Sequence, residues 1–344
     1  MSGVADVVDT AAATRRAAAR PRIAFVLGDP NGIGPEIAAK VLARPQNAAR
    51  ADIRIYSERA LLDAGSAVAG VAVPLATDRG DGPRLVETPL LDGERPTPGE
   101  ATLAGGRAAL RALTAAATAA RAGEVDGIVF APLNKHALRL AGLAEEDELR
   151  HLQAFFGVDG FVSEFNITGA LWTSRVTSHI PLKDVAAALT HDGIVDAIAI
   201  VDRYLRASGI ASPRIAVAAL NPHAGDGGSL GREEIDLIAP AVDAARAAGA
   251  NVQGPLPADT VFVAAQKGAY DAVVSMYHDQ GQIAMKLMGF DRGVTLHGGL
   301  PVPVATCASG TAFDIVGKNV ANAEGLQQAF ELTVRIAAGG RAAG

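Results

Sequence analysis

The stretch Ile23-Ala24-Phe25-Val26-Leu27, followed at once by Gly28-Asp29-Pro30-Asn31-Gly32-Ile33-Gly34-Pro35-Glu36, decides the fold of this chain. The first five residues form a continuous apolar run with the length and composition of a buried strand. The glycines that follow allow a sharp turn, and Pro35 suits the first turn of a helix. This pattern predicts a strand, a tight turn and a helix whose N-terminus can attract an anionic group.

The same alternation of short apolar runs and alanine-rich helical stretches continues along the chain. Strands are predicted at 53–56, 127–130, 173–177, 215–220, 272–275 and 293–296, and helices at 35–42, 102–121, 193–207, 232–248 and 324–337. Strand–helix alternation on this scale is typical of an α/β protein with largely parallel sheets. We therefore expect an α/β fold with two lobes and an active-site cleft between them.

The lobe boundaries are expected near Ala131 and Leu300, where the sequence has few distinctive features. Residues 1–20 are rich in alanine and arginine, have no apolar core like that of a secretory signal, and are expected to be a disordered extension. One lobe would comprise 21–130 and 300–344, and the other 131–299.

Composition excludes several classes of protein. Of 344 residues, 49% are hydrophobic and 20% charged, as in an ordinary globular protein. The net charge is −6 and the basic residues are not clustered, so nucleic acid is not an expected partner. The longest apolar runs are too short to span a membrane. The single cysteine, Cys307, can form no internal disulfide and fits a reducing compartment, so we expect a cytoplasmic protein.

Three of the seven histidines lie in polar, glycine-punctuated strings, each after a predicted buried strand: His179, His223 and His278. Imidazoles at strand ends can converge, and three neutral imidazoles with an open fourth position make a catalytic divalent-metal site. Any one of them could instead be a strand-end histidine that only hydrogen-bonds. Asp226 and Asp279 could orient imidazoles, or cap a turn or helix.

Two further motifs could serve a metal site of this kind. Lys286 follows His278 by about two turns of a predicted helix, where it could bind a substrate carboxylate or assist proton transfer; the alternative is a solvated surface lysine. The string from Gly310 to Lys318 has small residues that leave room for a nucleotide. Asp314 in this string could accept hydrogen bonds from ribose hydroxyls, or could simply be exposed.

Taken in order, these strings resemble the 4-hydroxythreonine-4-phosphate dehydrogenase family, which has the isopropylmalate dehydrogenase-like fold. The matching pieces span nearly the whole chain after Arg22: 28–36, 131–135, 179–182, 221–228, 254–260, 278–281 and 310–317. The resemblance implies a homodimer in which a secondary alcohol β to a carboxylate is oxidised by NAD or NADP, with loss of carbon dioxide in many members.

The resemblance also implies roles for individual residues. His179, His223 and His278 would be the metal ligands, with His278 donated across the dimer interface. Zinc suits three imidazoles best, and magnesium, manganese or cobalt could replace it. The expected catalytic residues are Lys286 and Asp259. The expected cofactor contacts are Asn221, Gly310, Thr311, Ala312, Asp314 and Asn322, and the expected substrate contacts are Asp29, Lys135, Glu148, Arg150, Lys286, Thr295 and Val304.

Departures from the family pattern concern the substrate. The family string Gly-His-Thr-Glu aligns with Asp147-Glu148-Leu149-Arg150, and the family's asparagine and arginine align with Thr295 and Val304. Ser309 replaces a histidine beside the nucleotide string. Valine cannot replace a bidentate anion clamp, and an acid repels phosphate. We therefore expect an unphosphorylated hydroxy acid or a carboxylated cis-dihydrodiol as substrate, with Arg150 meeting a second carboxylate. The alternative is 4-hydroxythreonine 4-phosphate or 4-phosphothreonate.

Two other classes of protein remain as alternatives. A non-catalytic binding protein on the same fold would bind no stoichiometric divalent ion, and the intact histidines and Lys286 argue against it. A hydrolytic metalloenzyme would turn over without any dinucleotide. The Gly310–Gly317 string argues against this second class.

Overall fold

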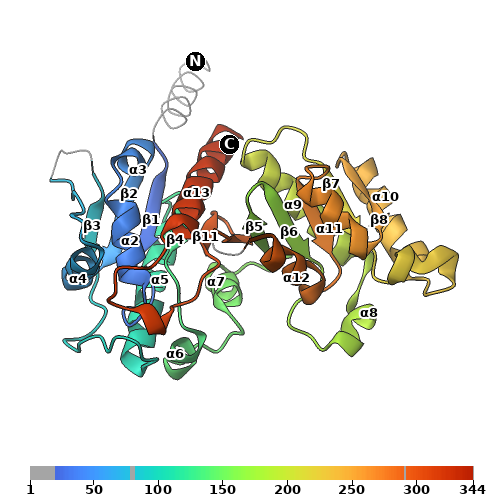
Figure 1. Ribbon diagram of the computed structural model, residues 1–344. Coiled ribbons are helices and arrows are strands. Elements are labelled where there is room, and N and C mark those ends of the chain that lie inside the picture. Colours follow the sequence, from blue (N-terminus) through green and yellow to red (C-terminus); the bar gives the residue numbers. More distant parts are fainter. Residues whose placement is uncertain (1–19, 78–81, 290–291, 344) are drawn as a thin grey trace, which may run out of the picture. The chain divides into compact units, whose positions relative to one another are not determined.

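The computed structural model describes residues 20–77, 82–289 and 292–343 (Figure 1). The chain divides into two compact units, one comprising Met1–Gly142, Thr311–Ala323 and Phe330–Gly344, the other Leu143–Gly310 and Glu324–Ala329. The boundaries therefore lie about ten residues after those expected from sequence. Apart from Arg20, the expected N-terminal extension lies outside the described residues.

The first unit is built on four parallel strands in the order β3-β2-β1-β4. Strand β1 (Arg22–Val26) is buried except at its first residue, and β4 (Gly127–Phe130) is buried throughout, as expected for parallel strands covered on both faces. The other elements of this unit are α2 (Gly34–Leu42), α3 (Pro45–Arg50), β2 (Asp52–Ser57), α4 (Arg59–Ala69), β3 (Arg84–Glu87), α5 (Leu103–Arg121), α6 (Lys135–Leu140) and η4 (Phe313–Ile315). Helix α13 (Glu324–Ala343) begins in the second unit and continues into the first.

The second unit has strands in the order β11-β10-β5-β6-β9-β7-β8. Strands β6 (Leu171–Arg175), β9 (Ala272–Ser275), β7 (Ile215–Ala218) and β8 (Val252–Leu256) run parallel. Strands β5 (Ser163–Thr168), β10 (Val294–Gly298) and β11 (Val304–Cys307) pair antiparallel. The predicted α/β class with mostly parallel sheets is confirmed.

Helices and short helical turns complete the second unit. They are α7 (Glu148–Phe156), η1 (Leu182–Asp184), α8 (Val185–Ala188), α9 (His191–Ala207), η2 (Pro222–Gly228), η3 (Glu234–Ile238), α10 (Ala239–Ala247), α11 (Ala258–Gln266) and α12 (His278–Gly289). No helix in the described ranges is both long enough and apolar enough to cross a membrane.

Helices α11 and α12 are anchored by an apolar cluster beneath them. Phe262 of α11 and Met285 of α12 pack with Ala216 of β7 and Val273 of β9. Burial of a large apolar side chain contributes about 1.5–3 kcal/mol. This packing fixes α12, so the position of His278 at the start of that helix is set by the core.

A row of polar side chains crosses β10, β5 and β6. His297 of β10 pairs with Val304 of β11 on one side and with Glu164 of β5 on the other. Arg175 of β6 donates from Nη2 to Glu164 Oε2 at 2.5 Å and from Nη1 to Asn166 Oδ1 at 2.8 Å. Because Arg175 is only 6% exposed, its charge is balanced within the protein by Glu164.

Candidate active site

The three predicted metal ligands follow three adjacent parallel strands. In the order β6-β9-β7, His179 follows β6, His278 follows β9 and His223 follows β7. The carboxyl ends of parallel strands share one edge of a sheet, so the topology brings these histidines to the same edge of the second unit. Sequence predicted this arrangement from the apolar runs before each histidine.

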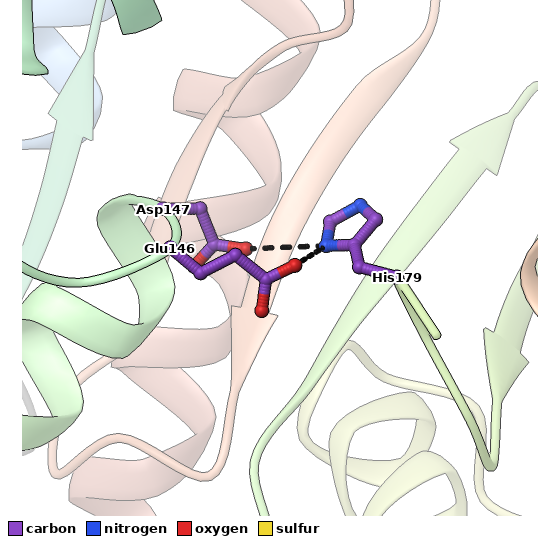
Figure 2. A group of neighbouring side chains, drawn as sticks. All are labelled: Glu146, Asp147 and His179. Atoms are coloured by element: carbon purple, nitrogen blue, oxygen red, sulfur yellow. Dashed lines mark ion pairs between the residues drawn. The ribbon is translucent and has the colours of Figure 1, made fainter. Parts of the chain in front are cut away.

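His179 contacts two carboxylates that come from the segment before α7. Its Nδ1 is paired with Glu146 Oε1 and lies 3.9 Å from Asp147 Oδ2 (Figure 2). Asp147 is 6% exposed, and its other oxygen caps α7 by accepting from the Arg150 amide at 2.9 Å. Figure 2 shows both carboxylates directed at the same ring nitrogen, Nδ1 of His179.

His278 has a similar carboxylate partner. Its Nδ1 lies 2.6 Å from Asp279 Oδ1, and its ring centroid lies 5.5 Å from that of His179. An ionised carboxylate only accepts hydrogen bonds, so Nδ1 of each ring carries the proton and Nε2 of a neutral ring is left to bind a ligand. Histidines oriented by carboxylates in this way are typical ligands of divalent metals.

The donor atoms fit a divalent ion in two ways. Nε2 of His179 and His278 could bind the ion with the carboxylates behind the rings, which is the arrangement that the predicted ligand set requires. Alternatively, Glu146, Asp147 and His179 offer three ligand atoms within 4.8 Å of one another. His223 belongs to no such group of three donors within the described part of the chain.

His223 lies in a turn with unusual backbone geometry. From His223 to Gly228 every residue has a positive φ, including the non-glycine residues His223, Ala224 and Asp226 at 45–55°. The left-handed region costs a residue with a side chain roughly 1–2 kcal/mol, so surrounding contacts must hold this turn. The Asp226 carboxylate accepts from Ser229 Oγ at 3.1 Å, so it caps the turn, the second of the roles that sequence left open.

Two cavities adjoin the histidines. One, of about 360 Å³, is lined by His179, His278, Leu182, Tyr277 and Asp279 among others. The second, of about 470 Å³, shares Tyr277 and Asp279 and is lined by the expected catalytic residue Asp259 and by residues of α11 and α12. The residues expected to bind a metal and to act as acid or base are therefore next to spaces that a small molecule can enter.

Lys286 lies on α12, the helix that begins at His278, as the sequence predicted. Lys286 is exposed, and its neighbours Ile283 and Leu287 are 61% and 83% exposed. An exposed ammonium on the helix that carries His278 is placed where it can bind an anionic ligand. The two apolar neighbours form a surface that water covers unfavourably.

The other expected substrate contacts of this unit differ in exposure. Arg150 is exposed and donates to Gln153 Oε1 at 2.8 Å, while Glu148 and Thr295 are partly exposed. Val304 is 0% exposed inside the sheet, so it has no surface that a substrate could touch. Leu149 is likewise buried, at 4%. The expectation that Val304 contacts the substrate is therefore not supported by its burial.

Three of the family-like strings meet in the first unit. The Ile33 amide donates to the Thr311 carbonyl at 3.0 Å, and Asn134 Nδ2 lies 3.4 Å from Thr311 Oγ1. A Cβ on Gly32 would lie 2.9 Å from Thr311 Cβ, so only glycine allows this approach. The glycine-rich turn, the segment before α6 and the expected nucleotide string are thus in contact.

The remaining residues that we expect to contact the cofactor or the substrate differ in exposure. Ala312 has a left-handed backbone with φ of 42°, and Asp314, Asn322 and Lys135 are exposed. In the second unit Gly310 is exposed. The side-chain amide of Asn221 already donates from Nδ2 to Glu233 Oε2 at 2.7 Å and to Glu234 Oε2 at 2.9 Å. Asn221 therefore helps to build the His223 turn.

Asp29 of the glycine-rich turn is fully buried, at 0% exposure. Its Oδ1 accepts from the Asn31 amide at 2.9 Å, and its Oδ2 has no hydrogen-bond partner among the described residues. Burial raises the pKa of the Asp29 carboxyl, against a smaller lowering by the Asn31 hydrogen bond. A buried carboxyl with one oxygen that lacks a hydrogen-bond partner can take up or release a proton, or accept a further hydrogen bond.

Glu146 and Glu234 are the site residues that sequence reasoning did not identify. Glu146 precedes a departure from the family pattern, but its contact with His179 joins segments more than thirty residues apart. Glu234 is 3% exposed and accepts from the amides of Leu220 and Asn221. The sequence indicated Glu234 in one way: it is an acid within an apolar helical pattern. A buried acid is unfavourable unless other groups in the protein pair with it.

The fold and this site define an α/β protein with a histidine–carboxylate centre at the edge of a parallel sheet. The model of the family described as pyridoxal phosphate biosynthetic protein PdxA matches residues 37–333, and the chain belongs to this family. This confirms the resemblance seen in the sequence. It makes the protein a dehydrogenase, an oxidoreductase acting on a CH–OH group.

Individual relatives are similar over nearly the whole chain. A Pseudomonas aeruginosa protein named "Putative 4-hydroxythreonine-4-phosphate dehydrogenase 2" is 47% identical over 92% of this chain and 97% of its own. The structure of 4-hydroxythreonine-4-phosphate dehydrogenase from Klebsiella pneumoniae has a TM-score of 0.79 and 38% identity, over 92% of this chain and 98% of its own. That of a terephthalate 1,2-cis-dihydrodiol dehydrogenase from Burkholderia xenovorans LB400 has a TM-score of 0.69 and 30% identity, over the same shares.

Proposed function

We propose that the protein oxidises a phosphate-free hydroxy acid, at a secondary alcohol β to a carboxylate, with NAD or NADP as oxidant and loss of carbon dioxide. The observation that carries this proposal is the pair of adjacent imidazoles, His179 and His278, each with a carboxylate on Nδ1. Together with His223 from the neighbouring strand end, they would hold one divalent ion, with zinc, magnesium, manganese or cobalt as candidates.

Each side chain has a role that follows from its place. A bound divalent ion would polarise the alcohol oxygen and stabilise the negative charge that develops when carbon dioxide leaves. Glu146 and Asp279 keep the proton on Nδ1 and so keep Nε2 available. Lys286 would bind the substrate carboxylate, and Asp259, which lines the adjoining cavity, would accept the alcohol proton. Thr311, Ala312 and Asp314 would face the dinucleotide, with Asp314 accepting from a ribose hydroxyl.

The carboxylates around His179 support the substrate class. Glu146 and Asp147 place negative charge beside one imidazole, and Glu148 follows them. Two unit charges 4 Å apart interact by about 4 kcal/mol near a protein surface, so a phosphate dianion there would be strongly disfavoured. The name of the Burkholderia structure, a cis-dihydrodiol dehydrogenase, describes a phosphate-free substrate of the expected kind.

The names of the other relatives favour a second candidate. The Pseudomonas and Klebsiella proteins are named for 4-hydroxythreonine 4-phosphate, and at 47% and 38% identity a shared substrate is a reasonable competitor. If this chain takes such a substrate, a cation outside the Glu146–Arg150 segment must bind the phosphate.

We also propose a homodimer whose active site is shared. Ile283 and Leu287 expose apolar surface on α12, the helix that starts with His278. A second copy of the chain that covered this surface would lie beside the residues expected to bind the metal. His278 would then be donated to the site of the partner.

The deciding experiment is NADH or NADPH formation by metal-replete protein with matched substrates. Phosphorylated hydroxy acids of the threonine type would be compared with their phosphate-free counterparts and with carboxylated cis-dihydrodiols. We expect turnover with phosphate-free acids only. Turnover restricted to the phosphorylated set would contradict the substrate proposal, and turnover of none with bound metal would contradict the dehydrogenase mechanism.

A further inference from the structure

We infer that Glu234 is a positioning residue for His223, and that its buried carboxylate holds the left-handed turn in the shape that presents this histidine to a metal. The inference rests on the proposed metal centre. It concerns a buried side chain that lines neither of the two cavities described above and accepts hydrogen bonds from the base of the turn.

The carboxylate of Glu234 is fully used by the segment before His223. Oε1 accepts from the Leu220 amide at 2.9 Å and from the Asn221 amide at 2.7 Å. Oε2 accepts from Asn221 Nδ2 at 2.9 Å. These two backbone amides lie where the chain leaves β7, so Glu234 fixes the direction in which the turn starts.

The far side of the turn also closes on the same carboxylate. Gly225 has φ of 80°, and a Cβ there would lie 2.8 Å from Glu234 Oε2. The Leu230 amide donates to the Gly225 carbonyl at 3.1 Å, which closes the loop behind His223. The Glu234 carboxylate therefore lies inside the turn, next to both the start and the far side of the turn.

The placement of Glu234 is itself unusual. It is 3% exposed and opens a π-helical turn, Glu234–Ile238, before α10. Short π-helical turns often occur at functional sites because they re-aim one side chain without ending the helix. Its neighbour Glu233 also contacts Asn221 Nδ2, at 2.7 Å, but it accepts from neither of these backbone amides. Both adjacent acids therefore contact the Asn221 side chain, but of the two it is Glu234 that also anchors the backbone.

The test compares E234Q with the matched control E233Q. In E234Q the new amide group would face Asn221 Nδ2, donor against donor, and the base of the turn would move. Cobalt(II) is the probe, titrated into each folded protein and followed by its visible absorption. Hydrogen exchange of residues 220–231 reports the turn independently of activity. We expect about tenfold or greater weakening of cobalt binding in E234Q, with faster exchange of the turn and little change at 177–180. E233Q should bind within about twofold of the wild type.

A folded E234Q with wild-type cobalt affinity, spectrum and exchange would overturn the inference. If E234Q does not unfold cooperatively, E234D replaces it, since it keeps the charge on a shorter side chain. Intermediate affinity in E234D supports positioning, and wild-type affinity contradicts it. Failure of the metal centre itself is distinguishable, because H223A would then bind cobalt like the wild type. In that case the inference about positioning a metal ligand is contradicted too, and hydrogen exchange in E234Q reports only whether Glu234 anchors the turn.

Discussion

At the scale of single residues, two of the three candidate ligands, His179 and His278, are oriented by carboxylate partners. Asp279 Oδ1 lies 2.6 Å from His278 Nδ1. D279N should leave the ring in place but replace the charged acceptor that holds Nδ1 and so orients Nε2. We expect metal affinity to fall about 10–100-fold, measured by titration with cobalt or zinc.

The chain supplies a matched control for this change. His191 Nδ1 and Asp192 Oδ1 form the same kind of sequence-adjacent pair, at 3.0 Å, at the start of α9. D192N should leave metal affinity unchanged. Equal affinities in D279N and the wild type would show that Asp279 does not support a ligand.

The buried Asp29 gives stability a pH dependence. Its pKa is raised by burial, so the folded state favours the protonated form. This contribution is fully present below the ordinary carboxyl pKa and is lost as the pH rises through the raised value. Once the pH exceeds the raised pKa, the buried ionised group lowers stability. In urea unfolding between pH 5 and 8, the free energy of unfolding of D29N should therefore rise relative to that of the wild type as the pH rises. The exposed D159N serves as control, and a constant or reversed difference would contradict this account.

At the scale of elements, apolar strands were predictable and polar strands were not. Gly127–Phe130 and Ala272–Ser275 have the expected bounds because both are apolar and buried throughout. Strand β5 (Ser163–Thr168) was missed because Glu164 and Asn166 lie along it. Their partner is Arg175, at the far end of the next strand, β6, which pairs antiparallel with β5. Local pattern cannot reveal a pairing of that kind.

The position of Val304 in this sheet determines how a charged substitution there affects stability. It is 0% exposed and lies opposite His297 in β11. V304R would bury a charge whose nearest acid, Glu164, already binds Arg175. We expect a loss of roughly 3–5 kcal/mol in the free energy of unfolding, measured in urea. V320R, at a valine that is 64% exposed, should change it by less than about 0.5 kcal/mol. A stable V304R that gains activity on phosphorylated acids would mean that this position faces the substrate.

At the scale of the whole molecule, sequence predicted two units and three histidines at one sheet edge, because strand ends and glycine turns are local features. It indicated Asp279 as a carboxylate that could orient an imidazole, but it identified neither Glu146 nor Glu234. Glu146 reaches His179 from before α7, and Glu234 reaches back to Leu220. Such contacts depend on the path of the chain between the elements. Neither could be predicted by residue type, since exposed acids are common and both have acidic neighbours.

Whether one chain or two complete the metal centre is the last prediction. The His179 and His278 rings lie 5.5 Å apart within one chain, whereas the shared-site proposal has His278 donated to the partner. Inactive H179A and H278A subunits should be refolded together as mixed dimers. If the site is shared, one of the two sites in each mixed dimer has all three histidines, so a statistical mixture should recover about a quarter of wild-type activity. H179A mixed with H223A should recover none, because both ligands would come from the same chain. Absence of rescue in the first pair, with mixed dimers verified by mass, would mean that each chain builds its own metal centre.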